Sequence, residues 1–115
     1  MIKVLMISTD QKILEEGSSV RARMQDYGKL FDELHIIVCT PKVLGLKSVE
    51  LSNNVRVYPT NSLTRFFYIF DAVKWGKKII AGKAWKKENT VITAQDPFET
   101  GRAAARLRNI LNCGL

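Results

Sequence analysis

Four short apolar runs rich in β-branched residues recur along the chain, and segments with a helical period of apolar residues separate them. Apolar runs bounded by Pro, Gly, Asn or Ser are typical of strands buried in a parallel sheet. Their alternation with helical segments predicts the order β-α-β-β-α-β-α, with crossover helices covering the sheet. The predicted strands are Ile2–Ser8, Leu34–Cys39, Val55–Tyr58 and Thr90–Ala94.

This pattern predicts the α/β fold class: one Rossmann-like, three-layer domain over residues 1–115, with a mostly parallel sheet. Counted along the chain, the strands are expected in the spatial order 3-2-1-4. The fourth strand is then an open sheet edge, which invites pairing with a further strand. The other expected elements are a helix opened by Ser18-Ser19, a loop over 41–54, and helices over Leu63–Ala84 and Phe98–Asn112.

The fourth strand stops at a polar triplet, Gln95-Asp96-Pro97, before the last helix. Pro97 has no N–H to give to a sheet ladder, so the triplet is expected at the carboxyl end of the strand. Ligands of open α/β sheets bind at that end, where Asp10 and Glu99 are expected to face the same cleft. The alternatives are that Asp96 only caps the last helix and that Asp10 is an ordinary loop residue.

A second candidate site is the loop Gly17-Ser18-Ser19 at the start of the first helix. Free N–H groups and a partial positive charge make a helix N-terminus suitable for a phosphate or carboxylate, and Gly17 permits close backbone approach. No Walker or dinucleotide-binding glycine pattern is present. The alternative is an ordinary capped helix in which Arg21 and Arg23 are solvated.

Three segments resemble the N-terminal half of family 4 glycosyltransferases, which have the two-domain GT-B architecture. The opening Met1–Ser8 is similar to the first strand of that family, and Gly17–Arg21 lies where the family has a small-residue loop before its first helix. Gln95-Asp96-Pro97 stands where many members have His-Glu-Pro or a similar triplet. The resemblance extends over nearly the whole chain in pattern.

The resemblance implies the acceptor-side domain of a retaining glycosyltransferase, which moves a sugar from a nucleotide-diphosphate sugar to an acceptor. The donor-binding domain is expected outside residues 1–115, as a missing C-terminal domain or another chain, so the isolated chain is expected to be inactive. No catalytic residue, metal ligand or cofactor is assigned to it; the nucleotide-diphosphate sugar is a substrate. The residues expected at the acceptor cleft are Gly17, Ser18, Gln95, Asp96 and Glu99.

Positive charge is concentrated in the segment Leu63–Lys87, which has seven cations and one anion, a net charge of +6 in a chain of net charge +7. Its aromatic and aliphatic stripe suits a core helix with an exposed basic back. It also suits a membrane-surface helix, with Lys74, Lys77 and Lys78 on anionic headgroups. Nucleic acid is not favoured as a partner, because the sequence contains no recognised binding module.

The class of protein stays open between this enzyme domain and a non-catalytic α/β interaction or membrane-surface adaptor domain. A receiver domain is excluded, because the third predicted strand ends in Tyr58-Pro59 rather than in an aspartate. Two cysteines, Cys39 and Cys113, form no disulfide framework, and the N-terminus has no signal-peptide pattern. A cytoplasmic, reducing location, with possible membrane association, is therefore expected.

Overall fold

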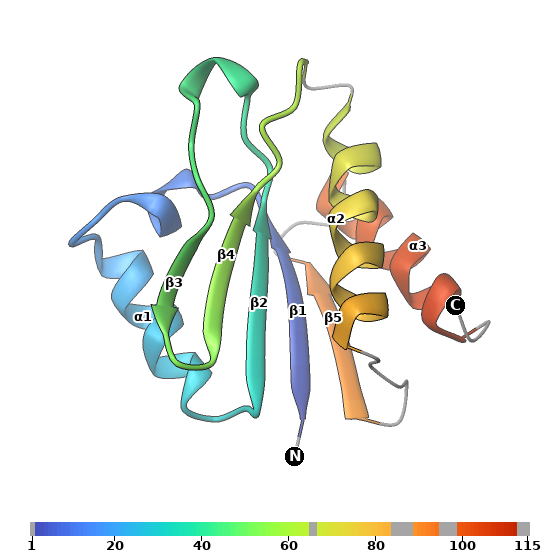
Figure 1. The fold of residues 1–115 in the computed structure, drawn as a ribbon, viewed down its shortest axis with the longest axis horizontal. Coiled ribbons are helices and arrows are strands. Elements are labelled where there is room, and N and C mark those ends of the chain that lie inside the picture. The colour runs from blue at the N-terminus through green and yellow to red at the C-terminus, as the bar shows by residue number, and fades with distance from the viewer. Residues whose placement is uncertain (1, 65–66, 84–88, 95–98, 113–115) are drawn as a thin grey trace.

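The computed structural model describes residues 2–64, 67–83, 89–94 and 99–112. It is an α/β fold with a five-stranded, mostly parallel sheet in the order β3-β4-β2-β1-β5 (Figure 1). The strands are β1 (Lys3–Ser8), β2 (Glu33–Val38), β3 (Val49–Ser52), β4 (Val55–Pro59) and β5 (Thr90–Ala94). The helices are α1 (Ser19–Gly28), α2 (Tyr68–Lys83) and α3 (Glu99–Asn112), with short 3-10 helices η1 (Gln11–Leu14) and η2 (Lys42–Leu44).

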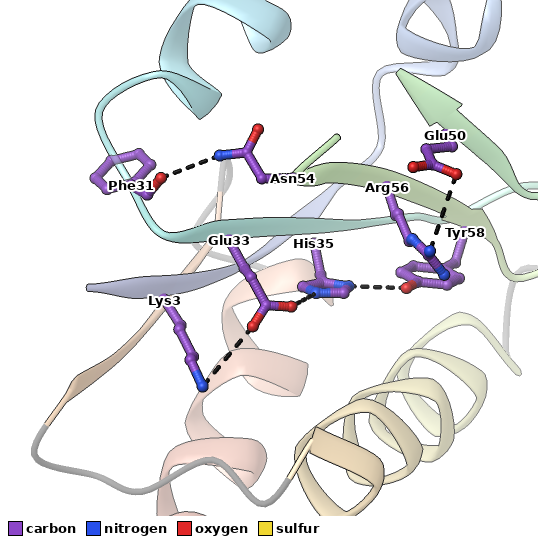
Figure 2. Close-up of polar contacts among 8 residues, drawn as sticks. All are labelled: Lys3, Phe31, Glu33, His35, Glu50, Asn54, Arg56 and Tyr58. Carbon is purple, nitrogen blue, oxygen red and sulfur yellow. Dashed lines mark hydrogen bonds and ion pairs between the residues drawn. The ribbon is translucent and has the colours of Figure 1, made fainter. Parts of the chain in front are cut away.

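The α/β class is confirmed, and the fold is compatible with a Rossmann-like domain. The predicted strand order 3-2-1-4 was wrong for the whole sheet, because it omits β3. Val49–Ser52 was predicted as loop, but it pairs antiparallel with β4 through a two-residue connection, Asn53-Asn54. The side-chain amide of Asn54 donates to the carbonyls of Gly28 and Phe31, which holds the hairpin against the end of α1 (Figure 2).

The long helix begins later than predicted, at Tyr68 rather than Leu63. Directly before the predicted start, Asn61 and Ser62 are held by the loop after β2. Ser62 forms an isolated parallel bridge with Pro41, and Asn61 has a positive φ of 48°. Asn tolerates this left-handed conformation better than most residues, and its side chain donates to the carbonyl of Leu46 at 2.7 Å.

Two apolar clusters form the core, one on each face of the sheet. On one face α1 packs against β3 and β4, and Val20 and Met24 meet the buried residues Leu34, Ile36 and Val57. On the other face α2 and α3 pack on each other and on β2, β1 and β5, with Leu5, Ile80 and Leu107 fully or almost fully buried. The sheet is therefore the middle of three layers.

Candidate functional site

The direction of winding reverses at β1, which lies between β2 and β5. The crossover to β2 passes through α1 on one face, and the crossover that ends at β5 passes through α2 on the other (Figure 1). The register aligns Ile7 of β1 with Ala94 of β5, so the carboxyl ends of these strands lie side by side. In open α/β sheets such a switch point is where ligands bind.

The Gly17-Ser18 loop is built as a capped helix start. Gly17 has a φ of +79°, which a side chain rarely adopts, and the Ser18 hydroxyl accepts from the Arg21 N–H at 3.1 Å. The same hydroxyl donates to the carbonyl of Lys12. The Arg21 guanidinium donates to the carbonyls of Ile13 and Leu14 at 3.0 and 2.8 Å, so it fastens the loop instead of being solvated.

Asp10 is a capping residue of η1 in the structure. Its carboxylate accepts from the Lys12 N–H at 3.0 Å, and its own N–H donates to the hydroxyl of buried Ser8. Gln95 and Asp96 lie outside the described residues, and so does the side chain of Glu99, the first residue of α3. Whether these carboxylates share a cleft with Asp10 therefore stays a prediction.

A pocket of about 220 Å³ lies between α2 and the end of β4. Thr60, directly after β4, forms one wall. The other wall comes from helix positions 71, 74, 75 and 78, which share one side of α2 because their spacing follows the helical period. The pocket thus combines a carboxylate, two ammonium groups and an indole ring, from Asp71, Lys74, Lys78 and Trp75. The Thr60 hydroxyl is already bonded to Thr40 and Ser62 in the interior.

Lys74 and Lys78 were predicted only as surface cations, and Trp75 belongs to the apolar stripe that was interpreted either as core or as a membrane surface. The pocket that they share was missed, because it exists only once Thr60 of the β4 end lies opposite α2. The spacing of Asp71, Lys74, Trp75 and Lys78 was the available signal. Lys78 Nζ lies 5.4 Å from the centroid of the Trp75 ring, within the range of a cation–π interaction. Lys77 is exposed and does not line the pocket.

A chain of polar side chains crosses the sheet beside this pocket (Figure 2). Trp75 packs on Tyr58, with ring centroids 5.2 Å apart. The Tyr58 hydroxyl is 2.8 Å from His35 Nδ1, and His35 Nε2 is 3.0 Å from a Glu33 carboxylate oxygen. Lys3 Nζ lies 3.7 Å from the other oxygen of Glu33. His35 is 2% exposed, so both ring nitrogens are used inside the protein.

Burial raises the pKa of the Tyr58 phenol above its usual value, and the Glu33 carboxylate adds to the effect while Arg56 opposes it. Tyr58 is therefore a neutral hydrogen-bonding group across the physiological range. His35 is the single histidine of the chain, and no role was predicted for it. Its signal was the alternation Glu33, His35 on β2 and Arg56, Tyr58 on β4, which places polar residues on one face of adjacent strands.

Much of the apolar stripe of α2 is core, since Ala72, Val73, Ile79 and Ile80 are buried, whereas Phe70 of the same stripe is 59% exposed. Lys74, Lys77 and Lys78 are exposed, and Lys74 and Lys78 lie on the side of the helix that lines the pocket. Within the described residues, no helix is both long and apolar enough to cross a membrane.

Comparison with known proteins gives no match: no protein-family model, no curated protein and no solved structure matches the chain. Among the described residues there is also no group of three or more His, Cys, Asp or Glu side chains that could hold a metal ion. A functional assignment therefore depends on the fold, the pocket and the polar chain described above.

Proposed function

We propose that the chain is the acceptor-side domain of a retaining glycosyltransferase that takes its sugar from a nucleotide-diphosphate sugar. The observation that carries the proposal is the pocket of Thr60, Asp71, Lys74, Trp75 and Lys78 at the carboxyl end of β4. The supporting context is a mostly parallel sheet, because small ligands of such sheets bind outside the carboxyl ends of the strands. The pocket is at that edge of the sheet, at β4, two strands from the switch point at β1.

The chemistry of the pocket suits a sugar or sugar phosphate. An indole ring offers an apolar surface to the C–H face of a sugar ring, and its N–H can meet a polar group. A carboxylate such as Asp71 accepts hydrogen bonds from hydroxyls, and Lys74 and Lys78 are cationic donors for a phosphate. Tyr58, held by His35, supports Trp75 from beneath and limits its movement.

In this proposal the domain binds and orients the acceptor, and the donor site belongs to a second domain or another chain. Acceptor contacts are assigned to Gly17, Ser18, Gln95, Asp96 and Glu99, in addition to the pocket. Because the Ser18 hydroxyl is used within the loop, its assigned contribution is through the backbone. The same proposal holds that the domain is truncated relative to a full GT-B half.

The proposal is tested by titrating the protein with a panel of monosaccharides, disaccharides and sugar phosphates while backbone amide NMR signals are recorded. Binding in the millimolar range is expected, with shifts at Thr60 and across 71–78. Lys74→Ala is expected to weaken binding of a sugar phosphate several-fold, because it removes a charge from the pocket. Lys77→Ala is the matched control, since Lys77 is an exposed lysine of the same helix outside the pocket.

The non-catalytic adaptor alternative predicts a different result in the same titration. If no saccharide or sugar phosphate shifts the pocket signals at tens of millimolar, the acceptor role is wrong. Equal effects of Lys74→Ala and Lys77→Ala would mean that the binding reflects surface charge and not the pocket. For the full enzyme, Gln95→Ala is expected to lower turnover without unfolding the protein.

A further inference from the structure

Two loops project past the carboxyl ends of the strands at the same end of the molecule (Figure 1). Both expose large apolar side chains. One is the loop with η2, where Val43 is 89% exposed and Leu44 50%. The other follows β4, where Leu63 is 71% exposed and Phe67 46%. We call Val43, Leu44, Leu63 and Phe67 the apolar tip. Single exposed apolar residues are common, but four on two loops that are joined at their base indicate an interaction surface.

Hydrogen bonds join the two loops at the base of the apolar tip. The backbone N–H of Lys42 donates to the Ser62 carbonyl and that of Ser62 to the Thr40 carbonyl, each at 2.8 Å. Beneath them the hydroxyls of Ser62 and Thr60 are 3.1 Å apart in the buried interior. The two loops are thus held together at their base, which lowers the entropy cost of docking.

The two loops that carry the tip contain cations and no carboxylate. From Pro41 to Val49 and from Pro59 to Phe70 the sequence has Lys42, Lys47 and Arg65 and no Asp or Glu. The next carboxylates along the chain are Glu50, which pairs with Arg56, and Asp71, which lines the pocket. Apolar side chains with lysines and arginines beside them, and no carboxylate, complement an anionic lipid surface: the apolar groups enter the headgroup region and the cations meet the lipid phosphates.

We propose that the apolar tip docks on an anionic phospholipid membrane, with the carboxyl ends of the strands facing the bilayer. This differs from the expectation that Lys74, Lys77 and Lys78 form the membrane surface. Figure 1 shows α2 running back from the tip, and Lys74 and Lys78 come seven and eleven positions after Phe67, about 10 and 16 Å along a helix. These distances are more than one and about two Debye lengths at physiological salt, so Lys42 and Lys47, which flank Val43 and Leu44 in the sequence, contribute most of the attraction.

The test is co-sedimentation of the whole 115-residue protein with vesicles, either of phosphatidylcholine alone or with about a third phosphatidylglycerol. Binding to the anionic vesicles only is expected. The double variant Val43→Ser, Leu63→Ser is expected to bind at least about tenfold more weakly, because it removes apolar area from the contact. Leu30→Ser is the matched control: Leu30 is 70% exposed, follows α1 and lies outside the tip, so binding should stay within about twofold.

A second pair of variants separates the tip from the helix. Lys42→Glu with Lys47→Glu is expected to abolish binding, whereas Lys77→Glu with Lys78→Glu weakens it only slightly. Circular dichroism should show unchanged folding, because all these side chains are exposed.

Three outcomes overturn the inference. Absence of wild-type binding at low salt is the first, and an equal loss in the tip and control variants is the second. The third is a protein dimer, seen by sedimentation velocity, that the tip variant dissociates while vesicles bind neither form. The inference does not depend on the proposed glycosyl transfer, since saccharide binding at the pocket and vesicle binding at the tip use different residues.

Discussion

Two halves of one face of the sheet have opposite chemistry. Over β1 and β5 the face is covered by α2 and α3, and the strands contribute Leu5, Ile7 and Ile92, all buried. Over β3 and the start of β4 the strands contribute Glu50 and Arg56, whose side chains are about half exposed. Helix α2 reaches this face at the end of β4, where Trp75 packs on Tyr58. The chain of Glu33, His35 and Tyr58 follows the border between the halves (Figure 2).

The difference shows how a single sheet supports both a core and a site. Val55 and Val57 of β4 pack under α1. The alternate residues point to the other face of the sheet, Arg56 toward the uncovered half and Tyr58 toward its border with the covered half. The border is where a partly buried polar group can be held by hydrogen bonds and still lie beside a pocket. Stability should therefore reside in the covered half, and ligand chemistry beside the uncovered one.

The largest expected effect separates the two halves directly. Leu107→Ala should lower the free energy of unfolding by about 2–5 kcal/mol, because Leu107 is fully buried between α3, α2 and the sheet. Arg56→Ala on the uncovered half should change it by no more than about 0.5 kcal/mol. Urea denaturation measures the free energy of unfolding of both variants. Similar decreases for the two would contradict the assignment of stability to the covered half.

Two glycines of α2 test how closely the helices of the covered half are packed. A Cβ on Gly76 would meet the Leu107 side chain, so Gly76→Ala should cost about 1–3 kcal/mol of stability by overpacking. Gly82 is exposed and has nothing within 4 Å of such a Cβ. Gly82→Ala should therefore stabilise the protein by about 0.5–1 kcal/mol, through higher helix propensity. Thermal melting of both variants tests the packing of α2 on α3, and shifts in the same direction would contradict it.

At the border, the smallest effect depends on pH. The folded protein raises the pKa of Tyr58, so the folded state keeps the phenol proton where the unfolded chain has lost it. The resulting stability is fully present below the unfolded tyrosine pKa of about 10 and is lost as pH rises through the folded pKa. Denaturation midpoints from pH 8 to 11 should therefore fall more for the wild type than for Tyr58→Phe. Tyr27→Phe, at an exposed tyrosine, is the control that should keep the wild-type slope.

The parts of the fold that were predictable are those that the local pattern encodes. Continuous apolar runs such as Ile36–Val38 can be buried only in a covered sheet, and the predicted class followed from them. β3 was not predictable in the same way, since four half-exposed residues carry no such run. The start of α2 was also misplaced, since just before it Ser62 pairs with Pro41, a contact that the local helical pattern does not encode. Both β3 and the start of α2 thus depend on contacts between segments distant in the sequence.

The candidate site was harder to predict than the fold, for a physical reason. Lys74 and Lys78 were identified, because the sequence shows lysines recurring along one predicted helix. Their partner Thr60 was not, because the two walls of the pocket meet only across β4 and α2. His35 needed the register of β2 and β4, which sets Tyr58 within hydrogen-bond reach. Sites assembled from distant segments carry no local signature.

The central position of β1 has a consequence for how the chain reaches its fold during synthesis. Lys3 of β1 pairs with Thr90 of β5, so one edge of the first strand has no β-strand partner until 87 further residues have been synthesised. At translation rates of about 5–20 residues per second, the wait is about 4–17 seconds. Throughout that time an apolar strand edge stays open on the nascent chain. Such a protein should associate with chaperones on the ribosome until Thr90–Ala94 has emerged.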